Sequence, residues 1–235
     1  MRWIFGAMLV LVLGVVGCSE TSGGGVSFEE ATLSYSVLTS RTGLGTDLVD
    51  ELRDSTLPTL EAAGAVVYGL WAAAAEHDEN FTEISDSRVV VMLAWAEVET
   101  ELLAAEFGAL ADVSTVQTRL WEPSLRGDER PPGPGFYVHR FEQYPTEDLD
   151  EALSLSESAW VTSEPTFENL VVGVWQELEV NDGLVWTVRI AWYEDLNHWY
   201  DSRNFARDPE SFLKFAQRAL LQVDDEPWSA SLLER

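Results

Sequence analysis

The sequence has 235 residues, is 46% hydrophobic, and carries 41 acidic against 14 basic residues, which gives a formal net charge of −27. A chain with this charge repels nucleic acid and anionic lipid headgroups, so DNA and RNA are excluded as expected partners. The apolar fraction argues against disorder, and the length suits one large or two small domains.

The first 17 residues have the form of a bacterial lipoprotein signal peptide. Arg2 supplies a positive start, residues 3–16 supply an apolar run too short for a comfortable transmembrane helix, and Val15-Val16-Gly17-Cys18 resembles a lipobox. We expect cleavage before Cys18 and lipidation of Cys18. An ordinary secretory signal or a short anchor is the alternative, but the only cysteine of the chain lies where small residues end the apolar run.

Lipidation of Cys18 predicts a protein tethered to a lipid bilayer outside the cytoplasm, with no membrane-spanning segment in the mature chain. Ser19 stands where Asp would favour the inner membrane, so we expect the outer membrane in a Gram-negative cell and otherwise the outer face of the cell membrane. Residues 18–30, rich in Gly and small polar residues, are expected to form a flexible tether. No free thiol is left for a disulfide, a Cys-ligated metal or a cysteine nucleophile.

Residues 31–122 are expected to form a first α+β unit. Strand signals lie over residues 32–40, 65–73, 88–95 and 113–121. A first helix is expected to begin at Thr46-Asp47 and to end near Gly64. A second helix is expected over residues 97–111, with one apolar stripe made of Val98, Leu102, Ala105 and Ala109. The order of elements is βαββαβ.

A Pro/Gly-rich linker is expected over residues 123–135, followed by a second unit over residues 136–235. Its expected strands cover residues 136–144, 170–178, 184–192 and 228–233. A helix is expected over residues 147–162, a hairpin turn at Asn181-Asp182-Gly183, and helical segments within residues 195–223. The last of these carries an apolar stripe made of Phe212, Phe215, Ala216, Ala219, Leu220 and Val223.

The two halves share short motifs. Gly69-Leu70-Trp71 recurs as Gly173-Val174-Trp175, and Leu93-Ala94-Trp95-Ala96-Glu97 recurs as Ile190-Ala191-Trp192-Tyr193-Glu194, which indicates duplication. Each half has the order of a ferredoxin-like unit. The strands are apolar on both faces, so the predicted fold class is α+β, with two ferredoxin-like βαββαβ repeats packed sheet to sheet as an intramolecular α+β barrel.

Three further sequence features are the segment 57–61 (LPTLE) followed by Gly64, the Gly-x-Trp motif of the second strand, and the segment 191–196 (AWYEDL) leading to Asp208-Pro209. In these features the chain resembles NIPSNAP-like members of the dimeric α+β barrel superfamily. It implies a pocket between sheet and helices, which other superfamily members use as cofactor-free monooxygenases, haem-binding enzymes or proteins without an assigned reaction. It brings no catalytic motif that maps onto this sequence.

Candidate catalytic groups are few. His77, His139 and His198 lie in different elements without the spacing of paired ligands, so no metal site is expected. His139 is the best candidate for an acid, a base or an axial haem ligand, because a strand can direct it into the barrel. Arg189 interrupts an apolar strand, which suggests a buried carboxylate or a bound anion as its partner. Both residues have an ordinary structural interpretation as well, in the core or in a salt bridge.

Aromatic residues in the strands are candidates for lining an apolar pocket, although they are also typical of a core. They are Tyr137, Trp71, Trp95, Trp175 and Trp192. The expected function is therefore an exported lipoprotein that binds a small apolar ligand or a protein partner, with no cofactor. The alternative is a cofactor-free monooxygenase or a haem-dependent oxidase working in the barrel pocket. The oligomeric state and the ligand are left open.

Overall fold

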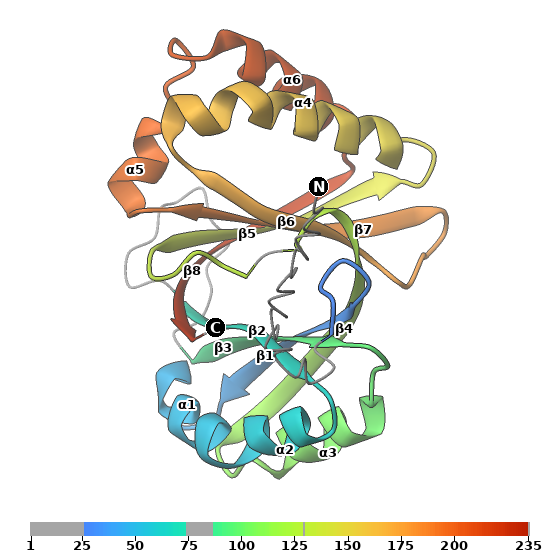
Figure 1. Ribbon diagram of the computed structural model, residues 1–235, viewed down its shortest axis with the longest axis vertical. Helices are drawn as coiled ribbons and strands as arrows, with labels where there is room; N and C mark the ends of the chain where they lie inside the picture. Colours follow the sequence, from blue (N-terminus) through green and yellow to red (C-terminus); the bar gives the residue numbers. More distant parts are fainter. Residues whose placement is uncertain (1–25, 74–86, 129, 235) are drawn as a thin grey trace, which may run out of the picture.

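A computed structural model describes residues 26–73, 87–128 and 130–234. The expected signal peptide, Cys18, most of the expected tether and His77 lie outside these residues. Eight antiparallel strands form a closed barrel with the order β1-β3-β2-β8-β5-β7-β6-β4. Helices α1 to α3 cover the outside of one half of the barrel, and α4 to α6 cover the outside of the other (Figure 1).

The strands and helices follow one another along the chain in the expected order. The strands are β1 (Thr32–Ser40), β2 (Val66–Ala73), β3 (Arg88–Trp95), β4 (Val113–Arg126), β5 (Phe136–Pro145), β6 (Leu170–Glu177), β7 (Leu184–Tyr193) and β8 (Asp224–Glu234). The helices are α1 (Leu48–Glu51), α2 (Leu57–Ala62), α3 (Thr100–Ala109), α4 (Leu149–Phe167), α5 (Leu196–Asp201) and α6 (Pro209–Ala219). No described helix is both long and apolar enough to cross a bilayer.

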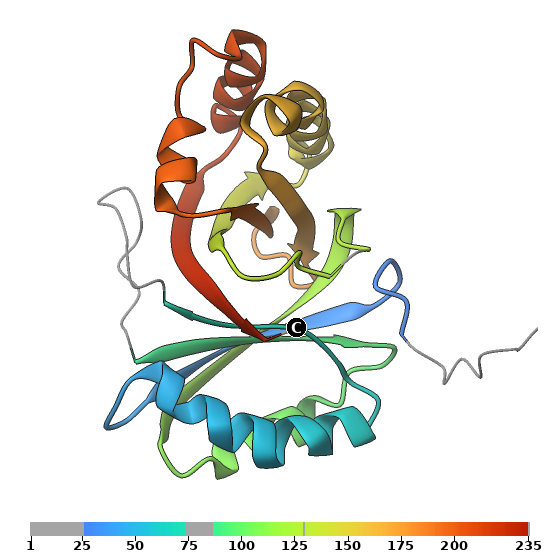
Figure 2. The same cartoon turned by 60° about the vertical axis from the view of Figure 1, so that its left-hand side comes forward.

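Two long strands join the halves. In the first half β4 pairs with β1, and from Trp121 onward it pairs with β6. In turn, β8 pairs with β5 and then with β2, and Figure 2 shows β8 (red) passing from the upper sheet to the lower one. Strand β4 thus extends five residues past its expected end, and a bulge between Pro123 and Leu125 accommodates the proline, which cannot donate to a ladder.

The two apolar faces of each strand pack in different cores, one inside the barrel and one under the helices. Val90 and Met92 of β3 point into the barrel, whereas Val89, Val91 and Leu93 pack under the helices of the first half. The expectation that both faces are buried, and that a closed α+β barrel achieves it, is confirmed. Val26 and Phe28, which lie within the expected tether, pack against the barrel interior.

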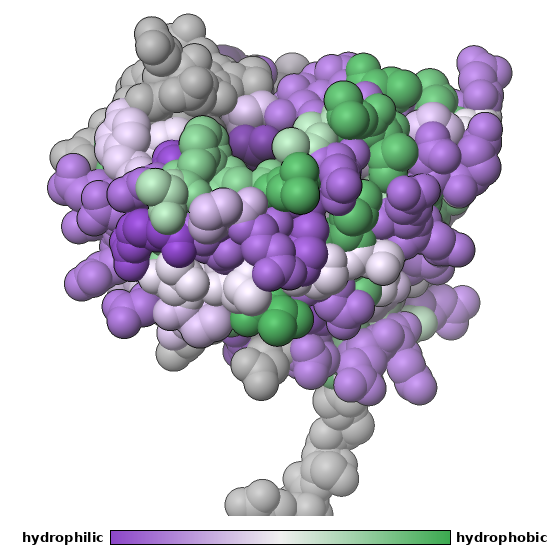
Figure 3. All heavy atoms as spheres, turned by 90° about the horizontal axis from the view of Figure 1, so that it is seen from above, coloured by the Kyte–Doolittle hydropathy of each residue, from purple (hydrophilic) through white to green (hydrophobic). Residues whose placement is uncertain are grey.

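Two helical stripes differ from expectation. In α3 the fully buried residues are Leu103 and Phe107, because the helix turns its larger side chains to the sheet. Of the expected stripe, Val98 and Leu102 are partly buried against the core of the first half, whereas Ala105 and Ala109 are exposed. Helix α6 ends at Ala219, so Leu220 and Val223 lie beyond the helix and are exposed. Apolar and hydrophilic side chains alternate on the outer face formed by α4 and α6 (Figure 3).

Helix α4 runs to Phe167, five residues past its expected end, although Pro165 lies in its last turn. Burial of Phe167, whose ring lies edge to face on Phe212, outweighs the poor helix propensity of proline in this turn. Glu168 ends the helix in a left-handed conformation at φ 56°. The extension matters for the site, since both Ser163 and Phe167 face a cavity described below.

Of the two repeated motifs, only Gly-x-Trp occupies matching places. Gly69 pairs with Met92 and Gly173 pairs with Ile190, each next to an irregularity in the ladder. By the same ladders Ala94 corresponds to Trp192, so the Ala-Trp pairs are out of register by one residue. Trp95 accordingly packs under the helices, and Trp192 packs against the barrel interior. A shift of one residue exchanges the faces of a strand.

Candidate functional site

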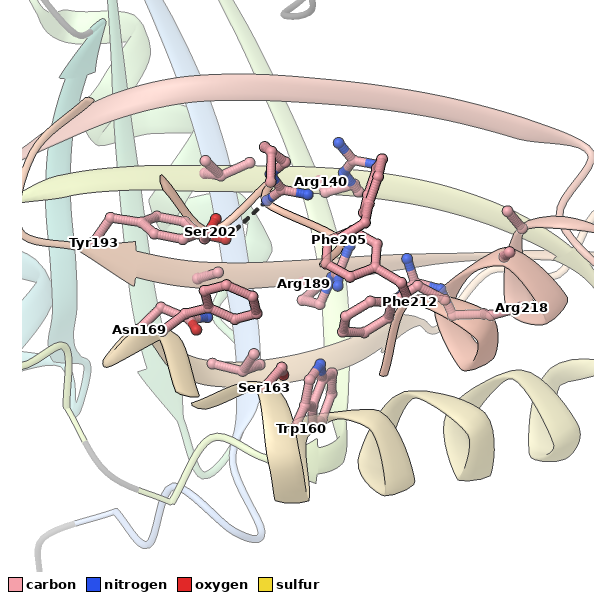
Figure 4. Close-up of a pocket in the computed structure, with 18 of the residues that line it drawn as sticks. Arg140, Trp160, Ser163, Asn169, Arg189, Tyr193, Ser202, Phe205, Phe212 and Arg218 are labelled. Atoms are coloured by element: carbon pink, nitrogen blue, oxygen red, sulfur yellow. Dashed lines mark hydrogen bonds between the residues drawn. The ribbon is translucent and has the colours of Figure 1, made fainter. Parts of the chain in front are cut away.

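A cavity of about 300 Å³ lies in the second half, between the outer face of its sheet and helices α4 and α6 (Figure 4). This volume is at the lower end of the range for small-molecule sites. Strands β5, β6 and β7 form its floor, α4 and α6 form its walls, and the segment between α5 and α6 lies at its rim. Its aromatic lining consists of Trp160, Phe167, Tyr193, Phe205, Phe212 and Phe215.

All the charged residues that line the cavity are arginines. They are Arg140 from β5, Arg189 from β7, Arg203 from the segment after α5, and Arg218 from α6. The chain has only 14 basic residues, so a cavity lined by four of them and by no acidic residue stands out against the net charge of −27. The cavity is a cationic site within an anionic protein.

Two carboxylates just outside the lining hold three of these arginines. Glu142 Oε1 accepts from Arg189 Nη2 at 3.2 Å and from Arg218 Nη2 at 2.9 Å, and Asp225 Oδ2 accepts from Arg140 Nη1 at 3.2 Å. Glu142 is only 3% exposed. Burial alone would raise the pKa of Glu142, but the guanidinium groups of Arg189, Arg218 and Arg140 outweigh burial and hold this pKa below its ordinary value.

Arg203 has a different environment. Its Nη2 donates to the Tyr193 hydroxyl at 3.1 Å, drawn as a dashed line in Figure 4, and its guanidinium lies 4.9 Å from the ring centre of Trp199. Partial desolvation and repulsion from Arg140 and Arg189 lower the pKa of Arg203, although the residue as a whole is exposed at the rim. Arg203 therefore adds a positive charge that neither Glu142 nor Asp225 binds directly.

His139, the leading histidine of the sequence, lies inside the barrel and does not line this cavity. Its Nδ1 shares a hydrogen bond of 2.8 Å with the Tyr35 hydroxyl, and its ring lies edge to face on Trp71 at 4.9 Å between centroids. Burial lowers the pKa of His139 to about 3, so the ring is neutral at physiological pH. Arg189, in contrast, does line the cavity and has a buried carboxylate as its partner.

The aromatic residues proposed from the sequence lie away from the cavity. Tyr137, Trp71 and Trp175 are fully buried in the barrel interior, Trp192 packs at its edge, and Trp95 lies under the helices of the first half. Trp95 Nε1 donates to Ser34 Oγ, and the Tyr137 hydroxyl donates to the Gly133 carbonyl. Among the described residues, the neighbours of these five side chains are other side chains of the core.

The cavity does not fit haem. Its lining contains no His, Cys or Met, and its one tyrosine, Tyr193, already accepts the bond from Arg203. His198 lies nearby, but its Nδ1 accepts from the Glu194 amide and its Nε2 contacts the Phe167 carbonyl, so both ring nitrogens are engaged. No group of three or more His, Cys, Asp or Glu residues able to hold a metal occurs among the described residues.

Sequence analysis did not identify Arg140, Arg203 and Arg218 as site residues. They come from three different elements, and only tertiary packing brings them to Arg189. One signal was available: Arg218 lies between Phe215 and Ala219 on a helix whose apolar stripe it interrupts, just as Arg189 interrupts its strand. A charge on an apolar face is the sequence pattern of a buried ion pair or a ligand contact.

No model of a known protein family matches this sequence, and no curated protein matches it. Solved structures do resemble its fold. An anthrone oxidase-like protein has a TM-score of 0.61 at 12% identity, covering 89% of this chain and 94% of its own. A candidate monooxygenase from Fusobacterium nucleatum subsp. nucleatum has a TM-score of 0.53 at 13% identity, covering 90% and 94%.

A chlorite dismutase from Candidatus Nitrospira defluvii has a TM-score of 0.54 at 8% identity, covering 87% of this chain and 91% of its own. These neighbours are dimeric α+β barrel and ferredoxin-fold proteins. The chain shares their α+β architecture with a closed eight-stranded antiparallel barrel. At these identities the similarity concerns the fold alone.

Proposed function

We propose that this protein is an exported lipoprotein, anchored through acylated Cys18, that binds a small and largely aromatic molecule in the cavity of its second half. The observation that carries the binding function is the cavity itself, walled by six aromatic rings and four arginines. Aromatic walls with a few placed polar groups are typical of small-molecule sites. Placement in the outer membrane of a Gram-negative cell, or on the outer face of another cell, belongs to the same proposal.

We also propose that the barrel is a tandem pair of ferredoxin-like repeats of the NIPSNAP-like kind. The strand order supports this organisation, because β4-β1-β3-β2 and β8-β5-β7-β6 follow the same scheme within the closed barrel. The matching positions of Gly69 and Gly173 support it further. Duplication followed by divergence of the second copy accounts for the cationic cavity in that half.

The anchor is tested in cells by Cys18→Ser. The variant should lose incorporation of labelled fatty acid and remain uncleaved or appear in the soluble fraction, because no thiol is left to carry the lipid. A matched Ser19→Ala variant should label and fractionate like the wild type. Normal processing and membrane attachment of the Cys18→Ser protein would contradict the proposal.

The binding function is tested with the chain from residue 19 onward, which retains every described residue, and with 2-naphthamide as a neutral aromatic probe in calorimetry. Ala191 is buried in the cavity floor, so Ala191→Leu should fill the cavity and weaken binding at least tenfold. Ala105→Leu on the exposed face of α3 is the control and should bind like the wild type. The proposal fails if the wild type shows no saturable binding, or if both variants bind equally well.

An oxygenase acting in the same cavity is the second candidate, favoured by the names of the anthrone oxidase-like and monooxygenase-like neighbours. Its test is oxygen uptake by the purified protein with anthrone and with a panel of quinols. Uptake that disappears in Ala191→Leu but persists in Ala105→Leu would favour the oxygenase. Substrate binding without uptake would favour the binding protein. A visible absorption spectrum recorded before and after haem addition tests the haem alternative, which the cavity lining argues against.

A further inference from the structure

The arginine cluster is arranged in a way that is costly for a purely structural role. Arg140 and Arg189 lie directly opposite each other on β5 and β7, and like charges in that position repel. Glu142 and Asp225 lie opposite each other on β5 and β8 and offset part of the repulsion. Four guanidinium groups then face two carboxylates, so the cluster keeps an excess of positive charge.

The same cavity lining holds hydrogen-bond donors without a partner among the described residues. They are the Nε of Arg218, the indole Nε1 of Trp160 and the hydroxyl of Ser163, and each of these residues is at most 5% exposed. The other two nitrogens of Arg218 are engaged, since Nη1 donates to Ser156 and Nη2 to Glu142. A buried donor without an acceptor destabilises the fold, and an acceptor on a ligand removes this penalty.

These groups surround one space. Figure 4 shows Trp160 and Ser163 on the α4 side, Arg218 on α6, and Arg189 on the strand between them, with Phe205 and Phe212 close by. The cationic and donor groups therefore meet the aromatic walls within a single cavity. A ligand that satisfies both must carry an acceptor with negative charge on a flat apolar body.

We propose that the cavity recognises a small aromatic carboxylate, whose ring packs between Trp160, Phe205 and Phe212 and whose oxyanion accepts from Arg203 and Arg218. This proposal deepens the proposed binding function and rests on it. The guanidinium groups of Arg203 and Arg218 offer donors to the carboxylate, and Ser163 or Trp160 supplies a further one. Arg189 and Arg140 contribute positive charge while Glu142 and Asp225 hold them in place.

The experiment compares 2-naphthoate with its neutral isostere 2-naphthamide by calorimetry on the chain from residue 19 onward. The acid should bind at least tenfold more tightly than the amide. Added salt should weaken binding of the acid but not binding of the amide. Arg203→Gln should reduce the affinity for the acid about tenfold and the affinity for the uncharged amide much less. This substitution leaves no buried carboxylate unpaired, because the described partners of Arg203 are Tyr193 and the Trp199 ring.

The matched control is Arg207→Gln in the same segment. Arg207 donates to the Thr166 carbonyl and lies over Phe167 without lining the cavity, so its loss should leave the affinity for the acid unchanged. Equal binding of acid and amide would overturn the carboxylate proposal while the binding function stands. Binding of neither probe would overturn both. Inorganic phosphate that binds as tightly as the acid would show that the cavity selects a bare oxyanion, and would also overturn the proposal.

Discussion

Gly69 and Gly173 make room for the largest side chains of the barrel interior. A Cβ at residue 173 would lie 2.6 Å from Trp175 Cη2 and 2.8 Å from Gly127 Cα, and a Cβ at residue 69 would lie 2.1 Å from Trp71 Cη2. Both tryptophans are completely buried, so they have no space into which to retreat. The shared Gly-x-Trp motif is thus a packing device in which the glycine accommodates the ring two residues later.

Gly173→Ala should therefore destabilise the protein by about 1–3 kcal/mol, the usual range for overpacking a closely packed core. Gly108→Ala is the control, because a Cβ there meets nothing within 4 Å and alanine favours the helix that contains it. The control should match the wild type or be more stable by up to about 1 kcal/mol. Urea denaturation measures both, and equal midpoints for the two variants would contradict the steric explanation.

His139 makes stability depend on pH. Its pKa is about 3 in the folded protein, below the value near 6.5 expected for an unfolded chain, because burial disfavours the charged ring. Its contribution is fully present above pH 6.5 and is lost as the pH falls from 6.5 towards 3, where only the unfolded chain takes up the proton. Between pH 7 and pH 5 this linkage amounts to about 2 kcal/mol.

The test compares wild type with His139→Gln, which cannot titrate, by urea denaturation at pH 7 and at pH 5. The wild type should lose about 2 kcal/mol more than the variant over this interval. The effects of other titrating groups on the free energy of unfolding cancel in this comparison, because both proteins share them. Identical losses in the two proteins would mean that His139 titrates normally in the folded state.

At the scale of elements, α6 brings Arg218 and two phenylalanines to the cavity, and its first turn fixes its position. Asp208 caps the helix by accepting from the Ser211 amide at 3.2 Å, and Pro209 occupies the first helical turn. Asp208→Ala should cost about 1 kcal/mol of stability, whereas Asp208→Asn should cost much less, because asparagine is a good N-cap. Thermal unfolding followed by circular dichroism distinguishes them, and equal losses would argue against capping.

Elements with clear periodicity were predictable from sequence, and elements whose ends depend on distant partners were not. The strands Thr32–Ser40 and Arg88–Trp95 match expectation, and the hairpin at Asn181-Asp182-Gly183 closes through reciprocal bonds between Asn181 and Leu184. The extra length of β4 comes from pairing with β6, and that of α4 from burial of Phe167. Neither contact can be predicted from the residues nearby in the sequence.

The candidate site was predictable only in part, for a related reason. Arg189 is predictable as a site residue because it interrupts an apolar strand, and it does line the cavity. Arg203 lies in an irregular segment where an arginine is unremarkable, and its importance comes from neighbours on β5 and β7. His139 is the most versatile group chemically that the sequence offers, yet its strand position turns it towards Tyr35 and away from the helices.

At the scale of the whole molecule, the closed barrel makes the two halves depend on each other. Leu125 of β4 packs in the core of the second half, and Leu233 of β8 packs in the core of the first. Neither half retains its full set of strand partners alone. We therefore expect one cooperative unfolding transition for the entire barrel.

Calorimetry checks this expectation through the ratio of calorimetric to van't Hoff enthalpy, which should be close to one. Gly173→Ala in the second half should also shift the far-UV and the tryptophan fluorescence transitions together. Two separated transitions, or a destabilisation confined to one half, would show that the halves unfold independently. The barrel closure through β4 and β8 would then contribute little to stability.

The central claim, that the second half holds a small aromatic acid between its sheet and α4 and α6, is tested most directly by crystallography. The chain from residue 19 onward would be crystallised with 6-bromo-2-naphthoate, and anomalous scattering would then locate the bromine. The account predicts one peak in the cavity, with the carboxylate within hydrogen-bond distance of Arg203 and Arg218. A peak elsewhere, such as the barrel interior beside His139, or an occupied cavity whose carboxylate points away from these arginines, would contradict it.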